Sequence, residues 1–245
     1  MTALLVFAAG YTINLCYISV FFHRGLAHRA IRLRPRALRF VVATGSWMTG
    51  LDPKAWVAMH RRHHADSDGP GDPHSPHIVG VGGVFLAQLR AYERELFALL
   101  SNHPAALARV RDLDFAVSWC NRRGLWWLPY GLHAALAVAL GLAAGPAIGI
   151  AWFAGLMSHP VQGWLVNAFG HASGGRTFDT ADGSRNNLWV ALLVFGEGLQ
   201  NNHHHRPSAA RFAVKWYEPD LGYALCRLFA WARLLDLDRQ PRLRR

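Results

Sequence analysis

The sequence His60-Arg61-Arg62-His63-His64 places three imidazoles at spacings of three and four residues. An α-helix turns by about 100° per residue, so these three side chains would lie on one helical face. Neutral imidazoles that converge from one turn are good metal ligands. A surface cluster of basic and polar residues is the alternative explanation for this stretch taken alone.

Two further histidine groups repeat the arrangement. His203 and His204 follow Gln200 at the spacing of the central stretch, and His23 and His28 lie five residues apart. All three groups stand beside apolar sequence. This recurrence favours a metal site over three unrelated surface clusters.

Asn167 and His171 join this set from the end of a long apolar segment. They are four residues apart and would share a helical face. Inward-facing polar groups at the end of a membrane helix are functional candidates, although an ordinary interfacial pair gives the same pattern. The predicted metal ligands are His23, His28, His60, His63, His64, His171, His203 and His204. One structural zinc ion takes four ligands, so this number of imidazoles indicates two metal ions.

The residue types leave several points of this site open. Imidazole ligands suit iron, copper or zinc, and ligand type alone does not choose between them. Glu197 can be a ligand or a hydrogen-bond partner of one. His133 and His159 are expected to make local hydrogen bonds within apolar segments, and His205 is expected to point away from the face of His203.

The composition is typical of a membrane protein. Of 245 residues, 52% are hydrophobic and 17% are charged, below the roughly 25% of soluble domains. The formal charge of +11 is first a signal of membrane topology. No nucleic-acid recognition module is visible, so we expect no nucleic-acid partner. Three scattered cysteines without a CxxC pair predict no thiolate metal site and no disulfide framework.

The apolar segments predict an all-α, multi-pass membrane protein with a single domain over residues 1–245. Residues 2–22 carry no charge and can cross a bilayer. Residues 125–175 lack Asp, Glu, Lys and Arg, and Gly145-Pro146 would turn between two further spans, at about 125–145 and 147–168. Arginines between 29 and 39 place the end of the first span in the cytoplasm. Three crossings then put every histidine group on the cytoplasmic side.

The remaining segments are read as interfacial or loop structure. Residues 40–51 and 188–195 are short apolar runs at an interface, and residues 66–76 are a loop. Residues 89–111 are predicted as an amphipathic helix broken near Pro104. Residues 216–245 are predicted as an amphipathic helix that ends in a basic tail.

Three motifs together resemble the histidine boxes of the membrane fatty-acyl desaturases of the acyl-CoA (stearoyl) type. They are HRGLAH at residues 23–28, HRRHH at residues 60–64 and GEGLQNNHH at residues 196–204. The similarity extends over roughly residues 10–240. It includes Trp56, Asp72-Pro73-His74-Ser75, Trp164-Leu165-Val166-Asn167 with His171, and the loop residues Arg176, Phe178, Thr180, Asp182, Ser184, Asn186 and Asn187.

The resemblance implies a pair of iron ions, O2 as co-substrate, and a cis double bond placed in a long acyl chain. By position, His23, His28, His60, His64 and one of His203 and His204 would hold one iron. His63, His171 and the other third-box histidine would hold the second iron, with Asn167 binding through a water. Trp164 would line the acyl tunnel. Gln200 stands where this family usually has His, and its amide oxygen would be a weaker ligand.

The same resemblance implies the partners. Acyl-CoA is the expected substrate, and a separate protein of the ferredoxin, rubredoxin or cytochrome type would supply electrons. Arg24, Arg61 and Arg62 could meet the phosphates of CoA or of a lipid headgroup, or could simply follow membrane topology. The family usually has four spans, so one span is either absent here or precedes this sequence.

Two other classes of protein remain open. A membrane di-iron hydroxylase acting on alkyl chains or lipids would use the same histidine boxes. A non-catalytic metal-binding membrane homologue is suggested by Gln200. A metal transporter would place its ligands inside the spans, whereas these boxes lie at span ends.

Overall fold

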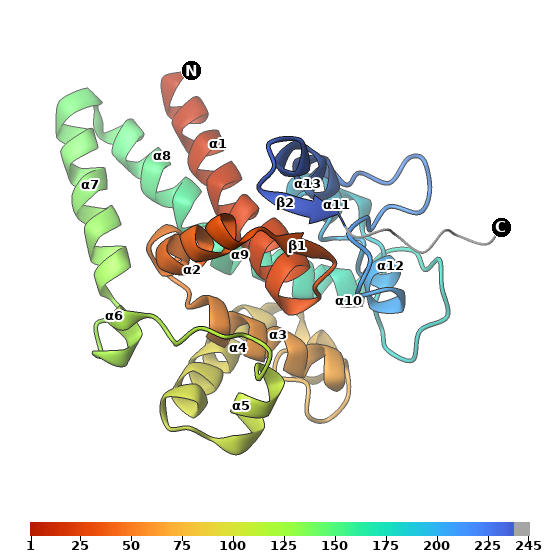
Figure 1. The fold of residues 1–245 in the computed structure, drawn as a ribbon. Coiled ribbons are helices and arrows are strands. Elements are labelled where there is room, and N and C mark those ends of the chain that lie inside the picture. The colour runs from red at the N-terminus through yellow and green to blue at the C-terminus, as the bar shows by residue number, and fades with distance from the viewer. Residues whose placement is uncertain (238–245) are drawn as a thin grey trace.

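The computed structural model describes residues 1–237 as a mostly helical chain (Figure 1). The helices are α1 Thr2–Leu15, η1 Cys16–Ala27, α2 Pro35–Thr49, α3 Pro53–Ala65, α4 Pro76–Leu100, α5 Pro104–Arg109, α6 Trp119–Arg122, α7 Leu128–Ala144, α8 Pro146–Leu156, α9 His159–Trp164, η2 Leu165–Phe169, α10 Gly170–Ala172, α11 Leu188–Leu193, α12 Gln200–His205 and α13 Leu221–Trp231. Two short strands, β1 Ile31–Leu33 and β2 Leu235–Leu237, pair antiparallel with Ile31 opposite Leu237. The mostly helical structure agrees with the predicted all-α fold, and the two short strands are a small addition to it.

Helices α1 and η1 form one continuous apolar rod, Thr2–Ala27, of 26 residues. Within residues 1–237 it is the one helix long and apolar enough to cross a membrane, by length and composition. Helices α7 and α8 have 17 and 11 residues. They meet at Gly145, whose φ of 102° suits glycine and makes the predicted turn. The expectation of three crossings stays a prediction.

The predicted third span is not one continuous helix. Helix α8 ends at Leu156 and α9 begins at His159. Pro160 has no N–H to bond to the preceding turn, so it suits the first turn of a new helix. This break places His159 at the start of α9, beside the pocket described below.

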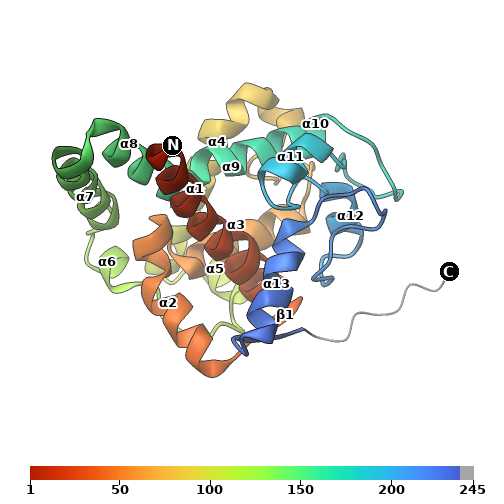
Figure 2. The same ribbon diagram turned by 90° about the horizontal axis from the view of Figure 1, so that it is seen from above.

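Close glycine contacts hold α1 against α8. A Cβ on Gly155 would lie 2.5 Å from the Phe7 carbonyl oxygen, and one on Gly10 would lie 2.9 Å from the Leu156 nitrogen. Along the rod, α1 packs against α8, and η1 packs against α13 (Figure 2). The rod that carries the first histidine group is therefore fixed by backbone-to-backbone packing.

We expect Gly155→Ala to destabilise the protein by about 1–3 kcal/mol, because the added methyl group must force the two helices apart. Thermal unfolding in detergent would measure the change. Gly82→Ala is the matched control, since nothing lies within 4 Å of a Cβ there. Equal stability of the two variants would contradict the packing described for α1 and α8.

Most other segments lie close to their predicted places. The loop over residues 66–76 is observed, and the chain breaks before Pro104, but α4 begins much earlier than predicted, at Pro76. Residues 40–51 fall largely within α2. The C-terminal helix is shorter than predicted and is followed by β2, and the basic tail at residues 238–245 lies outside the described residues.

Helix α3, which carries the central histidines, is anchored at both ends. Asp52 caps its N-terminus by accepting hydrogen bonds from the backbone N–H groups of Lys54 and Ala55. Near its C-terminus, Arg61 donates to the carbonyl oxygens of Leu26 and Ala27, at the end of η1. This contact joins the first and second histidine groups.

Candidate metal centre

The structure gathers the eight predicted histidines into two adjacent clusters. Five of them form one cluster: His23, His28, His60, His64 and His203. Three form the other: His63, His171 and His204. Within each cluster, one potential ligand atom per residue lies within 4.8 Å of the others. The geometry therefore separates His203 from His204, a choice that the sequence left open.

In the five-histidine cluster, several Nε2 atoms face one another. His203 Nε2 lies 3.0 Å from both His23 Nε2 and His64 Nε2, and His28 Nε2 lies 2.7 Å from His60 Nε2. A neutral imidazole carries one proton, so one Nε2 atom cannot satisfy two such neighbours equally. Nitrogen atoms converging in this way suit a shared cation at their centre.

A π-helical turn explains how His23 and His28 join this cluster. The backbone N–H of His28 donates to the His23 carbonyl oxygen, five residues back, at 3.1 Å. In an α-helix, residues five apart point about 140° away from each other. The wider turn of η1 brings the two rings to a centroid separation of 4.9 Å. Such π segments are frequent at functional sites.

Each ring of the three-histidine cluster is oriented by a carboxylate. His63 Nδ1 lies 3.0 Å from Asp72, His171 Nδ1 lies 2.8 Å from Asp68, and His204 Nδ1 lies 2.6 Å from Asp182. The Nε2 atoms of all three rings are buried and have no hydrogen-bond partner among the described residues. A carboxylate on one ring nitrogen fixes the tautomer that leaves the other nitrogen free for a metal. These orphaned atoms fit a metal ion.

The electrostatic environment keeps the ligands in their metal-binding form. Burial lowers the pKa of His60, His64 and His203 well below the usual value, so their rings stay neutral. Asp72 is itself buried, but its hydrogen bond from His63 lowers the pKa of the carboxyl to about 2. The carboxylate is therefore charged at neutral pH.

Glu197 orients the first ring of the five-histidine cluster. Its carboxylate lies 2.6 Å from His23 Nδ1 and accepts hydrogen bonds from Ser19 and Arg24. The Arg24 guanidinium is fully buried and also lies 3.0 Å from Asp220. Of the two roles open for Glu197, these contacts favour the hydrogen-bond partner.

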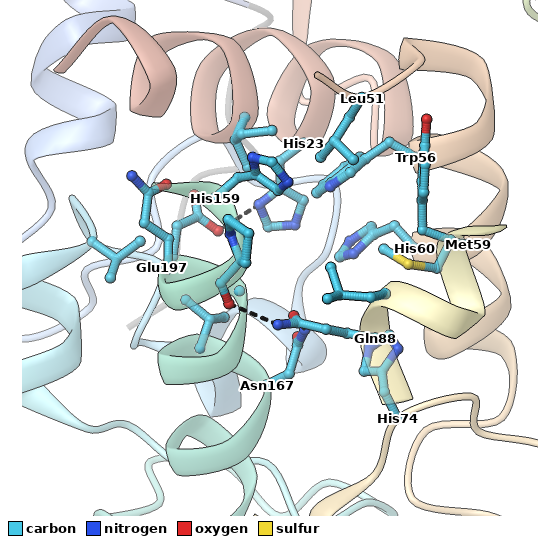
Figure 3. A pocket seen from close by; sticks show the side chains of 18 of the residues that line it. His23, Leu51, Trp56, Met59, His60, His74, Gln88, His159, Asn167 and Glu197 are labelled. Carbon is cyan, nitrogen blue, oxygen red and sulfur yellow. Dashed lines mark hydrogen bonds and ion pairs between the residues drawn. The ribbon is translucent and has the colours of Figure 1, made fainter. Parts of the chain in front are cut away.

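An inner pocket opens beside the clusters. Figure 3 shows His23 and His60 turned toward it, with Gln88 and Asn167 on the facing wall. Its cavity volume is about 80 Å³. Its lining is mostly apolar, which suits a hydrocarbon chain. The apolar and aromatic side chains include Ile18, Leu51, Trp56, Met59, Leu89 and Val166.

Three predicted site residues take distinct places around this pocket. Asn167 lines it and donates a 3.3 Å hydrogen bond to Gln88. Gln200 also lines it, and its side-chain amide donates to the Glu197 carbonyl oxygen at 2.6 Å. The Trp164 indole N–H donates a hydrogen bond to the Val81 carbonyl oxygen. Among the described residues, Trp164 is not one of those that line the pocket. Its place in an acyl tunnel stays a prediction.

The other histidines fall outside the clusters. His205 stacks on Phe178, with ring centroids 3.9 Å apart. His133 makes the expected local contact, with Nε2 2.8 Å from the Trp47 carbonyl oxygen. His74 is buried and stacks on His63, so it adds an imidazole that the sequence did not assign to the site.

The carboxylates behind the ligands were missed by the sequence reasoning. Asp68 and Asp72 lie in the loop that follows the central histidines, and Asp182 lies in the loop between α10 and α11. The available signal was the Asp-rich loop that follows the central histidines, together with the rule that a metal-bound histidine usually donates to a carboxylate.

Two of the three arginines that could have met a phosphate instead form ion pairs within the protein. Arg24 is buried in the ion pairs described above. Arg61 pairs with Asp112 at 2.5 Å and donates to backbone carbonyl oxygens. Arg62 lies 3.3 Å from Glu95 and is partly exposed. The phosphate-binding role is therefore wrong for Arg24 and is opposed by the contacts of Arg61.

We expect Asp182→Asn to weaken metal binding at the three-histidine cluster by roughly 10- to 100-fold. The amide introduced by this substitution carries no negative charge, so it holds the His204 Nδ1–H less strongly than the carboxylate does. The ring is then less well oriented, and its Nε2 is less basic. Competition with a chelator would measure the affinity. Asp179→Asn is the control, since Asp179 is fully exposed and makes no contact with the cluster residues. Unchanged affinity in Asp182→Asn would contradict the assigned role.

The fold and the two clusters define a helical protein whose histidines could hold metal ions beside an apolar pocket, and comparison with known proteins identifies its family. The model for the family described as fatty acid desaturase matches residues 1–227. A hex-5-enoyl-[acyl-carrier protein] acetylenase of Moorena producens is 35% identical over 88% of this chain and 70% of the relative. Delta-9 acyl-lipid desaturase 2 of Arabidopsis thaliana is 32% identical over 89% of this chain and 69% of the relative. A chloroplastic palmitoyl-monogalactosyldiacylglycerol delta-7 desaturase of the same plant is 35% identical, but the match spans 53% of its length.

The chain belongs to the fatty acid desaturase family. This membership confirms the resemblance seen in the motifs and indicates an oxidoreductase of lipid metabolism. The family is membrane-associated, in keeping with the apolar rod Thr2–Ala27.

Proposed function

We propose that this protein introduces a double bond into a fatty acyl chain, using O2 and two iron ions. The observation that carries the proposal is the pair of histidine clusters beside an apolar pocket, one with five imidazoles and one with three. When bound, the iron would supply the oxidising power to remove hydrogen from unactivated methylene groups. In the overall reaction, two adjacent methylenes lose two hydrogens in total, a donor protein supplies two electrons and solvent supplies two protons, so that O2 leaves as two waters.

The residues of this chain would perform the remaining tasks. The apolar wall at Ile18, Trp56 and Met59 would hold the acyl chain beside His23 and His60 and exclude water. The carboxylates of Asp68, Asp72 and Asp182 would keep the ligand rings in one tautomer. Asn167 is held by Gln88 at the pocket wall, which suits its proposed contact with a metal-bound water. A ferredoxin, rubredoxin or cytochrome would supply the electrons.

The group that carries the acyl chain can be identified by comparing substrates. The resemblance in the motifs favours acyl-CoA, whereas the relatives are named for an acyl-carrier protein, an acyl-lipid and a galactolipid. The experiment reconstitutes the iron-loaded protein with ferredoxin, its reductase and O2, and offers the same acyl chain on each of these carriers. Mass spectrometry of the released acyl chains identifies the product and the preferred carrier.

We expect a product that has lost two hydrogens from adjacent carbons, with one carrier strongly preferred. His64→Ala should abolish the product and His205→Ala should leave it unchanged, because His205 stacks outside the clusters. A hydroxylated chain would establish the hydroxylase alternative. No turnover in a protein that holds its metal would support the non-catalytic alternative.

A further inference from the structure

A second hollow, here called the outer pocket, adjoins the inner pocket. The outer pocket is lined by residues that include Gly50, Leu96, Phe97, Asn121 and Tyr130. It shares Leu51, Leu89, Tyr92 and His159 with the inner pocket. Exposed side chains at its rim include Glu93, Arg122 and Trp126. The two pockets therefore adjoin at these four side chains, with the exposed rim on one side and the space beside the histidine clusters on the other.

His159 is an unpartnered polar group at this junction. Its side chain is 8% exposed, its Nδ1 is fully buried, and no hydrogen bond to its ring is found among residues 1–237. The prediction of a local hydrogen bond is thus wrong for His159, while it holds for His133. A buried imidazole without a carboxylate partner is neutral, and it carries one N–H donor. Leaving such a donor unpaired costs free energy, so a hydrogen-bond acceptor on a bound ligand would stabilise the protein at this position.

A fatty acyl substrate has one group that could accept a hydrogen bond from His159. Between the metal side and the rim, the junction is lined by Leu51, Leu89 and Tyr92, and the Tyr92 hydroxyl already accepts a hydrogen bond from the backbone N–H of Asp52. A fatty acyl chain carries one strong acceptor at its carrier end, the carbonyl oxygen of its ester or thioester. The charged rim at Glu93 and Arg122 suits the polar carrier beyond that carbonyl.

Resting on the proposed function, we infer that His159 donates a hydrogen bond to the acyl carbonyl oxygen at the junction of the two pockets. The hydrocarbon then extends into the inner pocket and the carrier lies in the outer pocket. His159 is a positioning residue, since it acts on the carbonyl and not on the carbons that react. By fixing the carbonyl, it sets which carbon atoms lie beside His23 and His60.

The test compares two ligands that differ in the carbonyl group alone. An acyl-pantetheine thioester and the matching S-alkyl pantetheine thioether are titrated, without electron donor, into the full-length protein in detergent. Wild type should bind the thioester roughly 3- to 10-fold more tightly, the range expected for one hydrogen bond. His159→Leu should bind the two ligands equally. Isotope-edited infrared spectroscopy should show the bound carbonyl band at lower frequency in wild type than in His159→Leu.

Control variants separate this role from a structural one. His133→Leu removes a histidine already bonded to Trp47, so the preference for the thioester should persist. His159→Gln keeps an N–H donor, so it should retain part of the preference for the thioester and part of the shift of the carbonyl band. This variant keeps the inference testable if His159→Leu fails to fold. Equal binding of both ligands by wild type would overturn the inference and indicate that water occupies the junction.

The outcomes also distinguish this inference from the proposed function. Failure to bind either ligand at any chain length would count against both an acyl substrate and the role of His159. Tight binding of both ligands without a carbonyl preference would remove the role of His159 and leave the desaturase proposal standing. In the supported case, His159→Leu should also shift the position of the new double bond in the product.

Discussion

Iron-loaded wild-type protein should hold about two iron ions per chain, and the His204→Ala variant should hold about one. His204 is one of three imidazoles in its cluster, so its loss leaves two, which is too few to retain an ion tightly. His203 is one of five, and His203→Ala leaves four imidazoles in place. We therefore expect His203→Ala to retain more iron than His204→Ala. Metal analysis of the purified proteins measures both.

The activity of these variants should fall by more than the roughly 10- to 100-fold expected for the loss of an outer carboxylate. His205→Ala is the matched control, because it removes the neighbouring imidazole without touching either cluster. Zinc at about one ion per chain, or no tightly held metal, would rule out an oxidative centre. Equal iron loss in His203→Ala and His204→Ala would contradict the division into five and three ligands.

Replacing Arg24 by leucine should destabilise the fold by about 3–5 kcal/mol, the cost of breaking a buried ion pair. The guanidinium contacts Glu197 at 2.5 Å and Asp220 at 3.0 Å, and donates to the Ala210 carbonyl oxygen at 2.9 Å. Leucine would leave both carboxylates buried without their cation. Thermal or denaturant unfolding of the detergent-solubilised protein measures the loss.

Two comparison variants sharpen this prediction. Arg24→Lys keeps the charge but cannot span both carboxylates with a planar fork, so its stability should lie between wild type and Arg24→Leu. Arg34→Leu removes a partly exposed arginine that pairs with Asp236, and it should have a much smaller effect. Similar losses in Arg24→Leu and Arg34→Leu would show that burial does not set the strength of these pairs.

Local spacing made the candidate ligands predictable. His60, His63 and His64 share a face because α-helical geometry is the same in every protein, and the sequence carries that information directly. The hairpin at Gly145 was predictable for a similar reason, since glycine and proline mark turns locally.

The carboxylate partners could not be read in this way, because they depend on tertiary structure. Asp68 contacts His171 across 103 residues of sequence, and no periodic pattern links them. The π-helical turn at His23 and His28 is also a departure from regular spacing that apolar composition does not reveal. The break before His159 carries a local signal in Pro160, but the uncharged run over residues 125–175 was interpreted as two continuous spans.

The sequence separation of the clustered histidines affects the lifetime of the chain as well as its chemistry. His23 and His203 are 180 residues apart and meet at 3.0 Å. An ion held by both would join the two ends of most of the polypeptide, and because such a site exists only in the folded chain, its binding free energy adds to the stability of the folded state. Ligation and folding are then thermodynamically linked, so resistance to proteolysis should rise with iron supply. Cells short of iron would lose the polypeptide itself, and not merely its turnover.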